Sequence, residues 1–204
     1  MRIGIFGGTF DPVHVGHLIM AEQCREQARL DQIWFIPAAR PPHKKEQVLT
    51  AFDKRVEMLR LAIAGQPAFE VNEVEATRPG PSYTAETLAE LQTNFPGAQF
   101  QLIIGSDCLP DLPHWYQPSR IVELAGLLIV TRPGWPTWPV ETLPKELGLP
   151  HGSSLQQQIV PIPLIEISSS DLRQRVAAGR SIRYMVPKAV ECYIETHRLF
   201  APGG

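Results

Sequence analysis

Short apolar runs alternate with amphipathic stretches along most of this chain. Five runs are predicted to be strands, at residues 2–6, 32–37, 68–74, 99–105 and 127–131. Several of them are apolar without interruption, which is typical of strands buried on both faces. A sixth run, residues 159–165, contains Pro161 and Pro163. Because proline cannot donate a hydrogen bond to a neighbouring strand, we expect this run at an edge of the sheet.

Between and after these runs, apolar residues recur at helical spacing. The predicted helices cover residues 18–30, 52–64, 83–91, 172–178 and 186–200. Strand–helix alternation predicts an α/β fold, a Rossmann-like doubly wound parallel sheet with helices on both faces. The 204 residues fit one domain, 1–204, with the C-terminal helices from about residue 168 packed on the same core. Residues 132–154, rich in proline and tryptophan, are expected to form a long ordered excursion or lid.

Composition narrows the possible partners. The net charge of −2 provides no broad positive field for nucleic acid or for an anionic membrane. No apolar stretch approaches the roughly 18 residues of a membrane helix, and no signal peptide is expected. Cys24, Cys108 and Cys192 are odd in number and far apart, which favours thiols in a reducing cytoplasm over a disulfide framework or a zinc site.

The most informative stretch, "GGTFDPVHVGH", follows the first predicted strand. In doubly wound sheets, ligands bind at the carboxyl ends of the strands. Gly7 and Gly8 allow a ligand to approach the backbone closely. Asp11 is predicted to cap a helix that begins at Pro12 and directs N–H groups at an anion.

His14 and His17 are expected to share one face of that helix, with Gly16 leaving room for a phosphate. Taken alone, two histidines three residues apart are often only a polar helix face, and the third glycine of a dinucleotide fingerprint is missing. Taken whole, the eleven residues resemble the "GGTFDPxHxGH" signature of the nucleotidyltransferase superfamily. Its HxGH motif is related to the HIGH motif of class I aminoacyl-tRNA synthetases.

Two further stretches are candidate anion sites. In "PAARPPHKK", residues 37–45, a compact cationic loop follows the second strand and is either a solvated basic turn or a phosphate grip. Its charged residues are Arg40, His43, Lys44 and Lys45. In "PGPSYTAETL", residues 79–88, Thr84 is a predicted N-cap with Thr87 at the reciprocal position. Thr84 either caps and does nothing more, or N–H groups beside it receive a carboxylate or phosphate.

Two later stretches extend the pattern. In "GSDCLPDLPHWY", residues 105–116, Gly105 and Asp107 occupy the place of ribose or cofactor contacts. Trp115 offers either a flat face for an aromatic base or a packing anchor, and the pattern does not decide between them. In "ISSSDLRQR", residues 167–175, serine hydroxyls and Arg173 form either a second anion site or simply a capped helix.

Together these stretches resemble the bacterial-type nicotinate-nucleotide adenylyltransferases, on the motifs PPHK, SYTxxTL, GxDxLxxLxxW and ISSSxxR. The resemblance covers nearly the whole chain. It implies that a phosphate oxygen of nicotinate mononucleotide attacks the α-phosphorus of ATP in line, giving deamido-NAD and pyrophosphate in NAD biosynthesis. Because the second ionisation of a phosphate monoester lies near about pH 6, the nucleophile is already charged and no general base is needed. Catalysis then depends on positioning and on neutralising phosphate charge.

The resemblance also implies residue roles. His14, His17 and Arg173 are the expected catalytic residues, with His17 nearest the α-phosphate. The expected ATP contacts are Gly7, Gly8, Thr9, Phe10, Lys44, Gly105 and Ser170. The expected mononucleotide contacts are Thr84, Ala85, Asp107, Trp115 and Tyr116. In that set Trp115 stacks on the pyridine, N–H groups near Thr84, Ala85 and Tyr116 receive the carboxylate, and Asp107 contacts a ribose. Mg²⁺ is expected to arrive with ATP, with no dedicated metal site.

Three other functions are weighed. Pantetheine-phosphate adenylyltransferases share the opening motif, but they are usually shorter and lack SYTxxTL and the equivalent of Trp115. A regulatory module that binds nucleotide without turnover would be expected to have lost His17 or Arg173. A synthetase fragment would be expected to carry a KMSKS-like lysine loop and RNA-binding charge. Self-association is left open.

Overall fold

All strands of the computed structural model belong to one parallel sheet, in the part of the chain that it describes: residues 1–42, 49–131, 142–150 and 155–201. The order across the sheet is β3-β2-β1-β4-β5-β6, and every neighbouring pair is parallel. The strands are β1 (Arg2–Gly8), β2 (Gln32–Pro37), β3 (Phe69–Val71), β4 (Gln99–Gly105), β5 (Ala125–Thr131) and β6 (Gln157–Pro161). This is the doubly wound order, so the predicted α/β class is confirmed.

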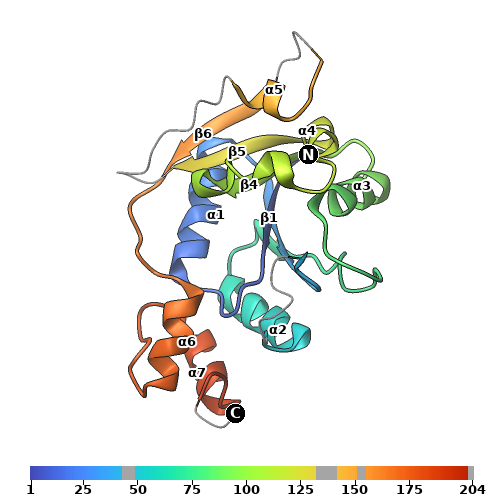
Figure 1. Ribbon diagram of the computed structural model, residues 1–204. Coiled ribbons are helices and arrows are strands. Elements are labelled where there is room, and N and C mark those ends of the chain that lie inside the picture. Colours follow the sequence, from blue (N-terminus) through green and yellow to red (C-terminus); the bar gives the residue numbers. More distant parts are fainter. Residues whose placement is uncertain (43–48, 132–141, 151–154, 202–204) are drawn as a thin grey trace.

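The helices follow the strands (Figure 1). They are α1 (Val15–Gln27), α2 (Phe52–Ile63), α3 (Thr84–Asn94), α4 (Pro118–Leu124), α5 (Leu143–Glu146), α6 (Ser169–Ala177) and α7 (Lys188–Thr196). Short 3₁₀ turns, η2 (Ser106–Cys108) and η3 (Leu112–His114), lie between β4 and α4. Each predicted helix is present with shifted ends, whereas α4 and α5 were not predicted because they are too short to show a helical period.

Two strand predictions need comment. The sixth strand lies at the edge of the sheet, as its prolines indicated. The third strand is shorter than residues 68–74, because only Phe69, Glu70 and Val71 pair with β2. Of the Pro/Trp-rich stretch 132–154, the structure describes residues 142–150, where α5 buries Leu143 against the sheet.

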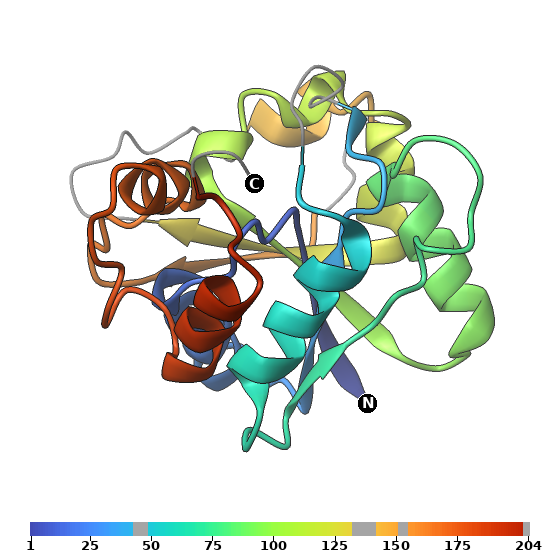
Figure 2. The same ribbon diagram turned by 90° about the horizontal axis from the view of Figure 1, so that it is seen from below.

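Side chains of the four central strands alternate between two hydrophobic layers. Ile33 and Phe35 of β2 point into one layer, with buried residues of α1, α2, α6 and α7. Trp34 and Ile36 point into the other, with α3, α4 and α5. Figure 2 shows α7 beside α2, and the two helices are in contact. Leu172 of α6 and Val190 of α7 therefore share one apolar cluster with the strands.

Within the residues described, no helix combines the length and the apolar character that crossing a bilayer requires.

Candidate functional site

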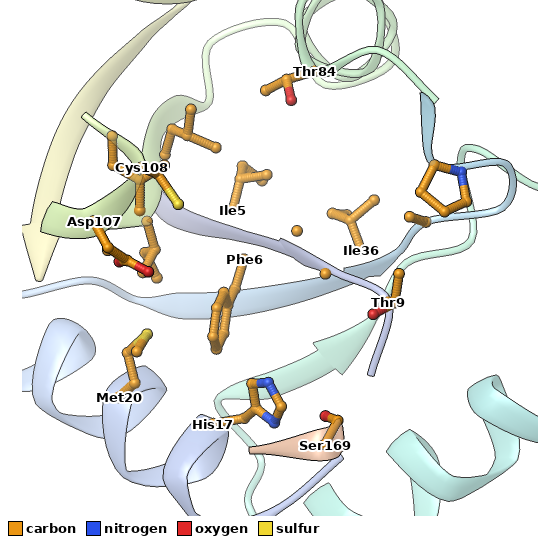
Figure 3. Close-up of a pocket in the computed structure, with 18 of the residues that line it drawn as sticks. Ile5, Phe6, Thr9, His17, Met20, Ile36, Thr84, Asp107, Cys108 and Ser169 are labelled. Carbon is orange, nitrogen blue, oxygen red and sulfur yellow. The ribbon is translucent and has the colours of Figure 1, made fainter. Parts of the chain in front are cut away.

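A cavity of about 550 Å³ opens where the strand order reverses, between the carboxyl ends of β1 and β4. Its volume is in the range of small-molecule sites, and its position is the one at which doubly wound sheets bind ligands. Figure 3 shows Thr84 on one side of β1, with His17 and Ser169 on the other. The cavity therefore has two halves, one beside α3 and one beside α1 and α6.

Most of the predicted site residues meet at this cavity. Those that line it are Gly7, Gly8, Thr9, His14, His17, Thr84, Gly105, Asp107 and Trp115. Phe10, Ala85, Tyr116, Ser170 and Arg173 are described but do not line it. Lys44 lies in residues 43–48, outside the described residues.

The glycines of the opening loop provide space. A Cβ on Gly7 would project into open space on the wall of the cavity, whereas one on Gly8 would come within 2.9 Å of the Phe10 ring. In this loop Phe10 has a left-handed backbone conformation, with φ of 48°. Its ring is buried against Phe6 and lies edge-on to His17, with centroids 5.1 Å apart. Phe10 thus supports the loop and His17 from beneath.

Helix α1 begins later than predicted. It starts at Val15 with His14 as N-cap, so the expectation that Asp11 caps a helix from Pro12 is wrong. Asp11 and Pro12 instead form a turn joined by a cis peptide bond. The Asp11 carboxylate is buried, and its Oδ2 accepts a hydrogen bond from the backbone N–H of Thr50 at 3.2 Å. Asp11 therefore joins the opening loop to the segment before α2.

The two histidines lie face to face at the start of α1. Their ring centroids are 3.7 Å apart, and the backbone N–H of His14 donates to Nδ1 of His17 at 3.2 Å. Because Nδ1 accepts, a neutral His17 carries its proton on Nε2, which makes that atom a donor. A Cβ on Gly16 would lie 3.0 Å from Nδ1 of His14, so a larger residue there would press on the pair.

Helix α6 docks on the opening loop. Ser168 caps it by accepting from the backbone N–H of Asp171 at 3.0 Å. Ser169 donates from its hydroxyl to the Pro12 carbonyl at 2.9 Å, and Arg173 donates from Nη1 to the Asp11 carbonyl at 2.7 Å.

Of the three consecutive serines at the start of α6, Ser168 and Ser169 line the cavity, whereas Ser170 does not. Arg173 is half-buried and reaches the loop backbone next to the cavity.

The opposite half is built on the start of α3. This helix begins at Thr84 with Tyr83 as N-cap, so the expectation that Thr84 is the cap is wrong by one residue. The first N–H groups of a helix have no intrahelical acceptor, and Thr84, the first residue of α3, lines the cavity. The Tyr83 ring stacks on Tyr116, with centroids 4.5 Å apart.

Thr87 does not complete a capping box. Its hydroxyl donates to the buried carboxylate of Glu75 at 2.7 Å and accepts from Nη2 of Arg78 at 2.9 Å. The other Glu75 oxygen accepts from the Ala39 backbone N–H at 3.3 Å. Glu75 therefore joins α3 to the end of β2 and lines the cavity, a role that the sequence pattern did not indicate. In the sequence, only the spacing of Glu75 and Arg78, three residues apart, hints that Glu75 has a nearby partner.

The loop after β4 also lines the cavity. A Cβ on Gly105 would overlap the Asp107 carboxylate, so only glycine leaves that side chain its place. Trp115 lines the cavity and also packs, half-buried, against the layer that contains α3 and α4. Both alternatives for Trp115 thus have a structural basis.

Two titratable side chains, Arg55 and Cys24, are buried, which the sequence pattern did not indicate. Burial lowers the pKa of the Arg55 guanidinium, while the carboxylates of Asp11 and Glu75 act in the opposite direction. Burial of Cys24 on α1 raises the pKa of its thiol to about 12. Within the described ranges, no three His, Cys, Asp or Glu side chains gather as a metal site would require.

Comparison with known proteins gives consistent matches. A model of the cytidylyltransferase-like family matches residues 5–175. A "probable nicotinate-nucleotide adenylyltransferase" of Thermomicrobium roseum is 44% identical over 199 residues, covering 98% of this chain and 91% of the relative. One from Thermus thermophilus is 44% identical over 202 residues, covering 98% of this chain and all of the relative.

Among solved structures, nicotinic acid mononucleotide adenylyltransferase of Plasmodium falciparum, complexed with NaAD, superposes with a TM-score of 0.78. The two sequences are 20% identical, and the match covers 98% of this chain and 97% of the other. At that identity the likeness establishes a shared fold.

Proposed function

Since the chain belongs to the cytidylyltransferase-like family, and within it to the nicotinate-nucleotide adenylyltransferases, we propose that it joins nicotinate mononucleotide to ATP and releases deamido-NAD and pyrophosphate. The observation that carries this proposal is the two-sided cavity. One half presents the histidine pair beside α6, and the other presents the start of α3 beside Trp115. This arrangement suits two nucleotides that meet above β1.

ATP takes the half beside α1 and α6. His17 directs its Nε2 proton at the α-phosphate, and His14 lies against it. Gly7, Gly8, Thr9 and Gly105 form the floor, while Ser170 and Arg173 reach the distal phosphates from α6. Phe10 supports this half from below, and Lys44 is assigned to the phosphates by the motif alone. Donors already in place for charge that develops on the phosphates lower the barrier without reorganisation.

Nicotinate mononucleotide takes the half beside α3. Trp115 stacks on the pyridine, and backbone N–H groups of Thr84, Ala85 and Tyr116 receive its carboxylate. Asp107 accepts from a ribose hydroxyl. The mononucleotide phosphate then points at the α-phosphorus of ATP, and its own charge suffices for attack.

Mg²⁺ would be held chiefly by the phosphates of ATP. Magnesium binds mainly through phosphate oxygens and water and needs few protein ligands, which fits the donor set of the cavity, where Asp107 is an exposed carboxylate. When bound it neutralises charge on the phosphates. We place the reaction in the cytoplasm, in keeping with three described cysteines that form no disulfide.

The test supplies the purified chain with ATP, Mg²⁺ and one acceptor at a time. The acceptors are nicotinate mononucleotide, nicotinamide mononucleotide and 4′-phosphopantetheine. We expect deamido-NAD by chromatography, with one pyrophosphate released per product. Turnover with phosphopantetheine alone would contradict the proposal, and binding of ATP without any pyrophosphate would indicate a non-catalytic module.

A further inference from the structure

Arg55 of α2 is a charged side chain that is buried almost completely, with 2% of its surface exposed. Arginine is rarely buried to this extent without partners, because its charge is costly to remove from water. Neither the motifs nor the proposed substrate contacts include it. Its burial therefore needs an explanation.

The guanidinium donates hydrogen bonds to three backbone carbonyls. Nη1 donates to Thr9 at 2.8 Å, Nη2 to Ala38 at 2.9 Å and Nε to Thr50 at 2.9 Å. The charge is offset from a distance by the buried carboxylates of Asp11 and Glu75. The planar guanidinium fork spreads its donors over three nitrogen atoms in fixed directions and so reaches three separate carbonyls, whereas the donors of a lysine all leave one nitrogen atom.

The three carbonyls come from three different segments around the cavity. Thr9 belongs to the opening loop after β1, Ala38 follows β2, and Thr50 precedes α2. Thr9 and Ala38 both line the cavity. The same segments are joined by the Ala38 N–H to the Gly8 carbonyl at 2.8 Å, and by the Thr50 N–H to Asp11. Arg55 lies at the centre of this junction.

We propose that Arg55 is a positioning residue, which sets the opening loop and the end of β2 at the spacing that brings the two nucleotides into line. It acts through the Thr9 and Ala38 backbones and touches neither substrate. The inference rests on the proposed function, because the loops matter to catalysis only if both nucleotides bind between them. Misplacement of reacting groups by about 1 Å costs up to about 10² in rate.

The experiment compares Arg55→Lys and Arg55→Gln with the wild type. Lysine keeps the charge and loses the fork, and glutamine removes the buried charge and keeps one donor group. The matched control is Leu59→Ala, on the same helix, fully buried in the core and away from the cavity. Each variant is assayed at a temperature where circular dichroism shows it fully folded. The readouts are kcat, both KM values and the melting temperature.

We expect kcat to fall at least tenfold in both Arg55 variants, with less than threefold change in the KM for ATP. Leu59→Ala should lose melting temperature and keep kcat within twofold. Arg55 variants that melt lower but retain wild-type kcat would reduce Arg55 to a structural residue and overturn the proposal.

A second measurement covers variants that fail to fold. In a crystal structure of the wild type with an ATP analogue, Arg55 should keep its three carbonyl partners and stay more than 4 Å from the nucleotide. Direct contact with the nucleotide, or release of Thr9, would overturn the proposal. A wild type that makes no deamido-NAD would contradict the proposed function alone, and this complex would still decide the role of Arg55.

Discussion

At the scale of single residues, His17 depends on neighbours that fix its ring. Its Nδ1 accepts from the His14 backbone, and Phe10 packs edge-on against it. The ring is therefore held in one orientation, which preorganises it for the phosphate contact assigned to it. His17→Ala should fold normally and lose about 10²–10³ in kcat, the cost of one preorganised donor.

Steady-state assays beside a melting curve check this. His197→Ala is the control, because the His197 ring packs at a tilt against Tyr193 at the C-terminal end of α7 and does not line the cavity. Near wild-type turnover in His17→Ala would remove His17 from the phosphate site.

Trp115 is the other residue whose role a substitution can resolve. Stacking on an aromatic base is worth about 1–3 kcal/mol, so Trp115→Ala should raise the KM for nicotinate mononucleotide roughly tenfold and leave that for ATP nearly unchanged. The preference for a carboxylate over an amide should survive, because it is assigned to backbone N–H groups. Titration of each substrate gives the answer.

Phe95→Ala serves as the stability control for Trp115. Phe95 packs edge-on against Trp34 and does not line the cavity. If Trp115→Ala resembles this control, with a lower melting temperature and equal losses for both substrates, Trp115 is a packing anchor.

At the scale of elements, α6 is joined to the opening loop by two hydrogen bonds, from Ser169 and Arg173. Arg173→Ala should raise the KM for ATP about tenfold or more, since the guanidinium is assigned to phosphates that are present in both ground and transition states. Arg175→Ala on the same helix is the control, because Arg175 donates to the Ser181 carbonyl instead. A weakened mononucleotide with unchanged ATP would assign Arg173 to the other substrate.

The sequence predicts elements well where a pattern is local. Buried apolar strands and amphipathic helices are periodic, so the sheet class followed from them, and the prolines of the sixth run indicated its edge position. The first residues of helices were predicted less accurately, because the choice of N-cap depends on tertiary contacts. Asp11 has good capping chemistry but is engaged by Thr50, 39 residues away, and this contact leaves no local signal. Arg55 and Glu75 escaped notice for the same reason.

At the scale of the whole molecule, the cavity separates elements that pack in different hydrophobic layers. The half assigned to ATP is built on α1 and α6, which share one layer, and the half assigned to the mononucleotide on α3, which packs in the other. The strands β1 and β4 connect the layers directly beneath the cavity. Because both halves of the cavity rest on these two strands, unfolding of the sheet should abolish both binding sites together.

The buried thiol of Cys24 makes the free energy of unfolding depend on pH. Its thiol is fully buried in the layer shared by α1 and α7, and burial raises its pKa from 9.0 to about 12. A raised folded-state pKa means that the stability contribution is complete below pH 9 and is lost as pH rises toward 12. At pH 10, one unit above the unfolded value, the loss is about 1.4 kcal/mol.

Cys24→Ala, which has no thiol to ionise, should show no such loss. Urea unfolding under reducing conditions at pH 7 and pH 10 measures the difference, with Cys192→Ala, an exposed thiol on α7, as the control for general alkaline effects. Equal pH dependence in wild type and Cys24→Ala would mean that the pKa of this thiol is the same in the folded and unfolded states, and it would contradict the raised pKa.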